Sequence, residues 1–154
     1  MMPGKLLQEI AQAKPWTCRE EEAFLNIART YEYLAQTLSE FFREYHLSMT
    51  QYNMLRILRG AGPEGLNCTE AARRMITHDP DVTRLFDRLE VRRLILRKRS
   101  SVDRRVVLAS ITEHGLELLS QMDEPLCDLH VRQMAGLTPE KLETLIEACE
   151  ALRP

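Results

Sequence analysis

VTRLFDRLEVRRLILRKRSSVDRRVVLASI, residues 82–111, is the stretch that decides the fold. Its opening segment, Val82–Val91, places apolar side chains at helical spacing and arginines largely on the opposite face. From Leu94 to Leu108, two extended runs flank a polar tip, and the first of them alternates apolar and basic residues. This pattern predicts a short basic β-hairpin. A helix followed directly by such a hairpin is typical of a winged helix that presents both elements to DNA.

Length and composition limit the class of protein. With 154 residues, 44% of them hydrophobic, the chain is expected to form one folded domain with its own core. The four cysteines are widely separated and form no CxxC pair, which argues against a zinc knuckle or a disulfide framework and favours a reducing cytoplasm. We expect neither a membrane helix nor a signal peptide, because no apolar run is long enough for the first and the start of the chain is unsuited to the second.

The charge is unevenly distributed along the chain. Residues 66–110 hold eleven Arg and Lys against six Asp and Glu, a balance of +5. The rest of the chain therefore carries −7, since the total is −2. A basic middle between acidic ends fits a module that binds a polyanion, flanked by helices with another role.

Long helices are predicted at both ends. Thr17-Cys18-Arg19-Glu20 has the sequence of a capping box, and the helix that it starts is expected to reach residue 46. Apolar residues recur in it at helical spacing: Phe24, Ile27, Tyr31, Leu34, Leu38, Phe41 and Tyr45. So long a helix exceeds what a small core needs, which suggests packing against a second chain. Thr112 should cap a later helix, kinked or broken at Pro125, and Thr138 should cap the last one.

Three shorter helices are predicted between the long ones. Ser48–Gln51 is a second capping box, and Asn67 should cap a helix that runs through Met75. Asp79-Pro80 should open the next helix, with the aspartate as its cap, and Val91 is expected on its buried face. Two short helices joined by a tight turn, the second with a polar exposed face, predict a helix-turn-helix.

In this order of elements, the chain resembles the MarR family of bacterial transcription regulators, from about Thr17 onward. The sharpest matches are Leu47–Leu58 (LSMTQYNMLRIL), Val82–Glu90 (VTRLFDRLE), Asp103–Arg105 (DRR) and Ile111–Gly115 (ITEHG). The combination of these motifs is specific, whereas each alone would be weak.

The resemblance implies a mainly α fold with a winged helix-turn-helix, and a single MarR-like domain over residues 1–154. Residues 48–111 would form the DNA-binding region, and residues 17–46 and 112–152 the dimerisation helices of an obligate homodimer. Each protomer would place its fourth helix in a major groove and its wing in the adjacent minor groove of a pseudo-palindromic operator. Family members are usually repressors, and many are released by small phenolic ligands or by oxidation.

Two positions depart from the family pattern. Gly is usual just before the first wing strand, where this chain has Arg93, so a turn with positive φ would strain that arginine. The recognition helix begins Asp79-Pro80-Asp81, where small hydroxyl residues are commoner. Its carboxylates would either repel the phosphate backbone or, at Asp81, accept a hydrogen bond from a cytosine amine.

The recognition helix supplies the first group of candidate DNA contacts. We assign Thr83 and Arg84 to base edges or phosphates and Arg88 mainly to phosphates, because the basic wing follows directly. The alternative is that these arginines are solvated charges paired with Asp81 or Asp87.

The wing supplies the second group. By the family resemblance, Asp103 orients Arg105 for the minor groove, with Arg104 beside it at the tip. Lys98 and Arg99 are assigned to phosphates. The alternative is a plain solvated turn.

Two further functions compete with this assignment. Cys18 stands near where a peroxide-sensing branch of the family carries its reactive cysteine, which makes a thiol-based redox regulator the first alternative. The second is a winged helix used as a protein-interaction module, supported by the two aspartates on the recognition helix.

Catalysis and cofactor binding are not expected. The sequence contains no P-loop, nucleophile elbow or dinucleotide-binding glycine motif. Cys127 and His130 share a helical face but lack the further ligands that a zinc site needs.

Overall fold

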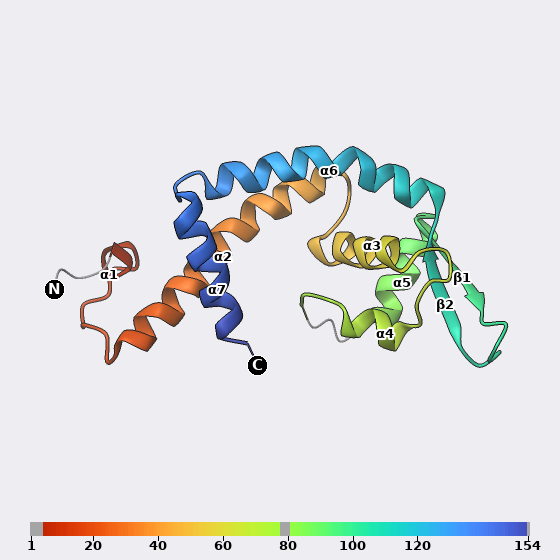
Figure 1. Ribbon diagram of the computed structural model, residues 1–154, viewed down its shortest axis with the longest axis horizontal. Helices are drawn as coiled ribbons and strands as arrows, with labels where there is room; N and C mark the ends of the chain where they lie inside the picture. The colour runs from red at the N-terminus through yellow and green to blue at the C-terminus, as the bar shows by residue number, and fades with distance from the viewer. Residues whose placement is uncertain (1–4, 78–80, 154) are drawn as a thin grey trace. The chain divides into compact units, whose positions relative to one another are not determined.

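A computed structural model describes residues 5–77 and 81–153 of the chain (Figure 1). It is mainly helical, with one two-stranded antiparallel sheet, which confirms the predicted fold class. The elements are α1 (Lys5–Glu9), α2 (Arg19–Glu44), α3 (Met49–Ala61), α4 (Cys68–Arg73), α5 (Val82–Val91), β1 (Ile95–Arg99), β2 (Val107–Ile111), α6 (Glu113–Met134) and α7 (Pro139–Ala151). Two compact units, Met1–Glu40 and Phe41–Pro154, divide the chain within α2. None of the described helices is long and apolar enough to cross a membrane.

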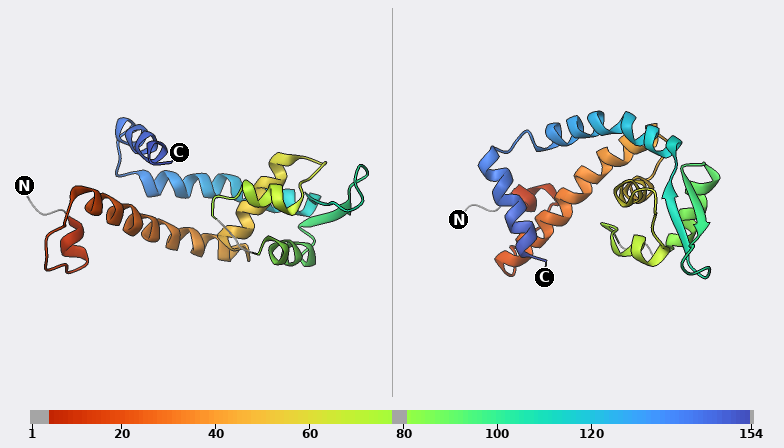
Figure 2. Two further views of the ribbon diagram at one scale, coloured as in Figure 1. Left: turned by 90° about the horizontal axis from the view of Figure 1, so that it is seen from below. Right: turned by 45° about the vertical axis from the view of Figure 1, so that its right-hand side comes forward.

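The second unit contains the winged helix-turn-helix. Helices α3, α4 and α5 gather beside the β1–β2 hairpin, as Figures 1 and 2 show. The largest fully buried side chains are Met54, Leu55, Leu58, Phe86, Leu89, Leu94, Ile95, Leu119 and Met122. Removing each of these from water contributes about 1.5–3 kcal/mol to folding. The core is therefore built from the apolar faces of α3, α5, β1 and α6.

One residue of the predicted α5 face lies elsewhere. Val91 is 85% exposed, whereas Leu89 is fully buried. Two residues correspond to roughly 200° around a helix, so the side chains of these residues point to opposite sides. The expectation that Val91 is buried was wrong.

Most of the predicted helix caps are confirmed. Ser48 Oγ accepts from the N–H of Gln51 at 3.1 Å, and the Ser48 N–H donates to Gln51 Oε1 at 2.9 Å, which completes the capping box. Asn67, Thr112 and Thr138 cap α4, α6 and α7 as expected. Each side-chain oxygen accepts one of the N–H groups that a helix start leaves without a partner.

Three predicted helix boundaries need correction. Helix α4 ends at Arg73 instead of Met75. The cap of α5 is Asp81, whose Oδ1 accepts from the N–H of Arg84 at 3.1 Å; Asp79-Pro80, predicted for this role, lies outside the described residues. Of the kink or break expected at Pro125, the break is wrong, because α6 continues through this residue.

The start of α2 also differs from the prediction. The Thr17 N–H donates to Glu21 Oε2 at 2.7 Å, whereas Glu20 was expected to accept this bond. Because α2 begins only at Arg19, the carboxylate that reaches back to Thr17 is the one four residues along.

The turn between α5 and β1 has the strained geometry anticipated from the sequence. Arg93 has φ +57°, the left-handed region that favours glycine. Its N–H donates to Glu90 O at 2.8 Å, and the N–H of Leu94 donates to Leu89 O at 3.0 Å. These two bonds form a Schellman motif, and Leu89 and Leu94, at the two positions that usually make its apolar contact, are both buried.

The same motif ends α2. His46 has φ +55°, and the N–H of Leu47 donates to Phe42 O at 2.9 Å. Arg92 connects the two helix ends, because its Nη1 donates to His46 O at 2.5 Å and its Nη2 to Tyr45 O at 3.4 Å. A guanidinium thus binds carbonyls at the negative end of a helix.

The hairpin is held against the helices by a third short extended segment. β1 and β2 pair antiparallel from Ile95↔Ile111 to Arg99↔Val107, and Leu66 bridges to Ala109 on the outer side. Gly65 has φ +72°, and a Cβ there would lie 2.3 Å from the carbonyl oxygen of Ala109. Only glycine allows this close approach of the chain to β2.

Candidate DNA-binding surface

Helix α5 has one buried and one exposed face. Val82, Leu85, Phe86 and Leu89 are buried in the core of the second unit. Thr83, Arg84 and Arg88 are exposed, as their helical spacing predicted. The polar groups suited to contact DNA therefore lie on the face that the fold leaves open.

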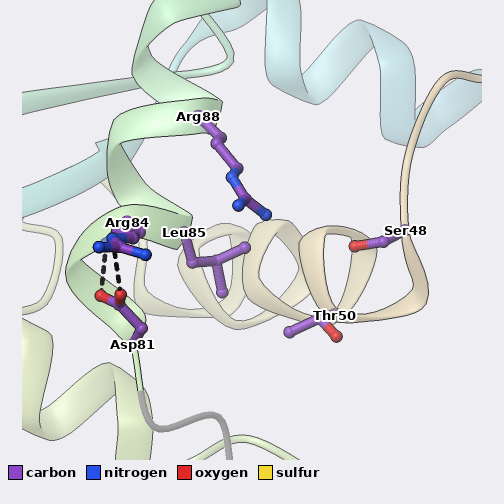
Figure 3. Close-up of a pocket in the computed structure, with 6 residues that line it drawn as sticks. All are labelled: Ser48, Thr50, Asp81, Arg84, Leu85 and Arg88. Atoms are coloured by element: carbon purple, nitrogen blue, oxygen red, sulfur yellow. Dashed lines mark hydrogen bonds and ion pairs between the residues drawn. The ribbon is translucent and has the colours of Figure 1, made fainter.

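Arg84 forms an ion pair with the residue that caps its own helix. Its Nε lies 3.0 Å from Asp81 Oδ2, while Asp81 Oδ1 accepts from the Arg84 N–H (Figure 3). This is the pairing that the sequence analysis held open as an alternative to DNA contact. The Arg84 side chain nevertheless remains 77% exposed, so the pair lies at the surface, where a ligand can reach it.

A hollow of about 240 Å³ lies between α5 and the first turn of α3. Figure 3 shows Arg88 extending from α5 toward α3, where Ser48 and Thr50 lie. The residues that line the hollow are Ser48, Thr50, Asp81, Arg84, Leu85 and Arg88. Guanidinium and hydroxyl groups in this arrangement suit the oxygens of a phosphate, as protein–DNA interfaces commonly use them.

The wing tip is folded by its own side chains. Ser100 Oγ accepts from the N–H groups of Val102 at 3.2 Å and Asp103 at 3.4 Å. Asp103 Oδ1 accepts from the backbone N–H of Arg105 at 2.9 Å. Asp103 thus holds the backbone of Arg105, the arginine that it orients according to the family resemblance.

The basic side chains of the wing are available to solvent. Lys98, Arg99, Arg104 and Arg105 are all exposed. Arg84 and Arg88 of α5, in the same unit, are exposed as well.

One arginine of this basic run has a different role, which the sequence analysis missed. Arg97 Nε donates to Glu90 Oε2 at 2.8 Å, and its Nη2 lies 2.7 Å from Asp87 Oδ1. The wing strand β1 is thereby joined to the last turns of α5. The hydrogen bond from Arg97 holds the pKa of Glu90 below its usual range. Strand alternation was the available signal, because Arg97 shares a face of β1 with buried Ile95, whereas Lys98 lies on the other face.

Cys18 lies exposed just before α2, in the first unit. The pKa of Glu20 is lowered by a hydrogen bond with its own backbone and by another with Cys18. Reactive thiols are typically found beside cationic groups, so a carboxylate contact does not favour the redox alternative. Within residues 5–77 and 81–153, no cluster of three or more His, Cys, Asp or Glu side chains could hold a metal ion.

The fold and this surface define a winged helix-turn-helix protein of the DNA-binding type. The MarR family model matches residues 47–107, which include α3 to β1 and the start of β2. A MarR transcription factor from Planctomyces limnophilus is 40% identical, with a TM-score of 0.69 over 88% of this chain and 98% of that protein.

Two other proteins are similar over most of the chain. The transcriptional repressor IacR of Pseudomonas putida is 25% identical over 134 residues, which cover 87% of this chain and 79% of that protein. The structure of a mutant MarR from E. coli in complex with operator DNA matches with a TM-score of 0.78 at 21% identity, over 98% of this chain and all of that one, a likeness of fold. The chain belongs to the MarR family and is a DNA-binding transcription regulator.

Proposed function

We propose that this regulator is a homodimeric repressor that binds a pseudo-palindromic operator and is released by a small aromatic effector. The observation that carries the proposal is the exposure of Arg84 and Arg88 on α5 together with the basic wing that follows in the same unit. The opposite face of α5 is buried in the core, so the face with these arginines is the one open to a ligand.

In the proposed complex, α5 lies in the major groove and the wing reaches the adjacent minor groove. Thr83 and Arg84 contact base edges or phosphates, with Asp81 at the start of the helix, and Arg88 binds a phosphate. Arg88 is suited to this role because the hollow beside it also offers Thr50.

The wing makes the second set of contacts. Lys98 and Arg99, at the end of β1, neutralise phosphates. Arg104, at the tip of the wing, lies beside the minor groove. Arg105 enters the minor groove from a backbone that Asp103 holds in place. Arginine suits a narrow minor groove because that groove concentrates negative potential.

Residues 17–46 and 112–152 are proposed to pair with the same helices of a second copy. The support is their exposed apolar side chains, among them Phe24 and Tyr31 of α2 and Leu145 and Ile146 of α7. Two copies of α5 would then read half-sites about one helical turn apart.

The repressor role rests on family membership and on the relative IacR, which is a transcriptional repressor. The effector rests on the family resemblance alone. A cytoplasmic location is part of the proposal, because it is where a DNA-binding regulator of this family would act.

Selection from a random duplex library at low salt, followed by titration of the enriched sequence, tests the proposal. We expect one enriched pseudo-palindrome. Its affinity should fall steeply as salt rises, because bound Arg and Lys displace counterions from the phosphates. A protein that enriches no duplex at any salt concentration is not the regulator proposed, and an acidic protein partner would become the better candidate.

A further inference from the structure

Asp81 is the unusual residue of the DNA-binding surface, since it places a negative charge at the start of the helix that should approach DNA. Its carboxylate directs both oxygens to one residue: Oδ1 accepts from the Arg84 N–H at 3.1 Å, and Oδ2 lies 3.0 Å from Arg84 Nε. The first contact caps α5, and the second holds the guanidinium of the Arg84 side chain.

The contact at Nε determines how the guanidinium can be presented. The group is planar and rigid, so a carboxylate bound at Nε restricts the plane of the whole fork. Its two terminal nitrogens, Nη1 and Nη2, are the pair that can bind the O6 and N7 of guanine, the commonest base-specific contact in the major groove. Figure 3 shows Arg84 and Asp81 together at the start of α5, while Arg88 extends separately toward α3.

Preorganisation matters here because Arg84 is 77% exposed. A long exposed side chain loses rotamer freedom when it engages a base, and a partner that already restrains it reduces that loss. The partner charge also makes the hydrogen bond stronger than a neutral one would be.

We propose that Asp81 is a positioning residue for base recognition, which holds Arg84 for a bidentate contact with a guanine in each half-site. The inference rests on the proposed function and deepens it by naming the base. Asp81 itself contacts no base in this proposal. Its negative charge contributes to specificity by holding Arg84.

The test uses the full chain and three variants. Asp81→Ser keeps a residue that caps helices well but is too short to reach Nε. Asp81→Asn keeps the cap and a neutral acceptor. Arg84→Ala removes the reading group itself. Affinities are measured by fluorescence anisotropy for the selected operator and for duplexes in which each G·C pair of the half-site is replaced in turn.

For the wild type we expect one G·C position at which replacement weakens binding strongly, and Arg84→Ala should abolish that preference. Asp81→Ser should reduce the preference at this same position by fivefold or more and leave the preferences elsewhere unchanged. Asp81→Asn should lie between the wild type and Asp81→Ser. In the Arg84→Ala background, Asp81→Ser should cause no further loss, because the two residues act as one unit.

Glu64→Gln is the matched control for the loss of one negative charge, since Glu64 is exposed in the loop between α3 and α4. It should leave every base preference as it is. Circular dichroism and the thermal midpoint of Asp81→Ser establish that α5 is still capped. If they change, Asp81→Asn alone must show the reduced preference.

Two results overturn the positioning role while the proposed function stands. If Asp81→Ser tightens binding to all duplexes by one common factor, the carboxylate merely repels phosphates. If a base preference remains in the Arg84→Ala protein and Asp81→Ser then reduces it, Asp81 contacts a base itself. A wild type without any sequence preference would instead contradict the proposed function.

Discussion

The winged-helix region and the terminal helices share the same amphipathic pattern, but its apolar side chains are buried in the first and exposed in the second. In α5, Leu85, Phe86 and Leu89 are buried against the chain's own core. In α7, Leu145 and Ile146 recur at the same spacing but are 42% and 44% exposed, and none of residues 139–151, all of which are described, is buried. Phe24 in α2 is 68% exposed.

The difference shows where each region obtains its stability. An apolar stripe stabilises a helix only when another surface covers it. For α5, the winged helix supplies that surface from α4 and strand β1 of the hairpin. The terminal helices present stripes that the proposed second copy would cover. Stability of the first region should therefore respond to core packing, and that of the second to protein concentration.

Phe86→Ala should have the largest effect. Phe86 is 1% exposed, and truncating a buried phenylalanine leaves a cavity that costs about 3–5 kcal/mol. Chemical denaturation should show this loss at every protein concentration. Val91→Ala, at an exposed position of the same helix, is the control and should change stability by less than about 0.5 kcal/mol. A comparable loss in both variants would mean that α5 does not pack as described.

Leu145→Glu should separate the two copies of the proposed dimer. A charge in a buried apolar interface is costly to desolvate, so we expect the dimer to dissociate at least about a hundredfold more readily. Sedimentation equilibrium measures the change. Thr144→Glu places the same charge off the apolar stripe and should leave the dimer intact. A Leu145→Glu protein that stays dimeric would remove α7 from the interface.

Arg105→Ala should weaken operator binding about tenfold to a hundredfold, because it removes a charged groove contact while leaving the fold unchanged. A mobility-shift titration measures the loss, and sedimentation should show that the dimer persists. Arg105→Lys keeps the charge and should retain part of the affinity. Unchanged binding of the alanine variant would exclude the wing from the mechanism.

Arg93→Gly should stabilise the winged helix by roughly 1 kcal/mol. A residue with a side chain at φ +57° pays for the left-handed conformation, which glycine adopts freely. The thermal midpoint should rise for Arg93→Gly and not for Arg93→Ala, whose Cβ meets the same strain. A rise in both variants would place the effect in the arginine side chain instead of the backbone.

The smallest effect should be a dependence of stability on pH through Glu90. The pKa of Glu90 is lowered in the folded state by its hydrogen bond with Arg97. The ion pair therefore contributes stability above the usual pKa of a glutamate, and this contribution is lost as pH falls through the lowered value. Denaturation midpoints measured from neutral to acidic pH should fall less for Glu90→Gln than for the wild type. Glu143→Gln, an exposed position of α7, should follow the wild type; equal curves for all three proteins would contradict a role for the Glu90 pair.

Much of the fold could be predicted because its signals are local. The caps at Ser48, Asn67, Thr112 and Thr138 depend on side chains that bind a backbone N–H three residues along. The left-handed turn at Arg93 could be anticipated only from the family resemblance, since the family usually has Gly at this position. The hairpin could be predicted from two extended runs on either side of a polar tip, the first of which alternates apolar and basic residues. The exposed face of α5, with Thr83, Arg84 and Arg88, follows from helical spacing alone.

By itself, then, the sequence determined the order of the elements from α2 onward, the charge of the middle region and the arginines on the open face of α5. It could do so because periodicity and capping depend on neighbours along the chain. Only the tertiary structure decided which charges are paired. Arg97 and Glu90 lie on different elements, and Arg92 binds carbonyls 46 and 47 residues earlier in the chain. Partners of that kind are set by how helices and strands pack. That packing separates Arg97, which joins the wing to α5, from Lys98 and Arg99, which remain open to solvent.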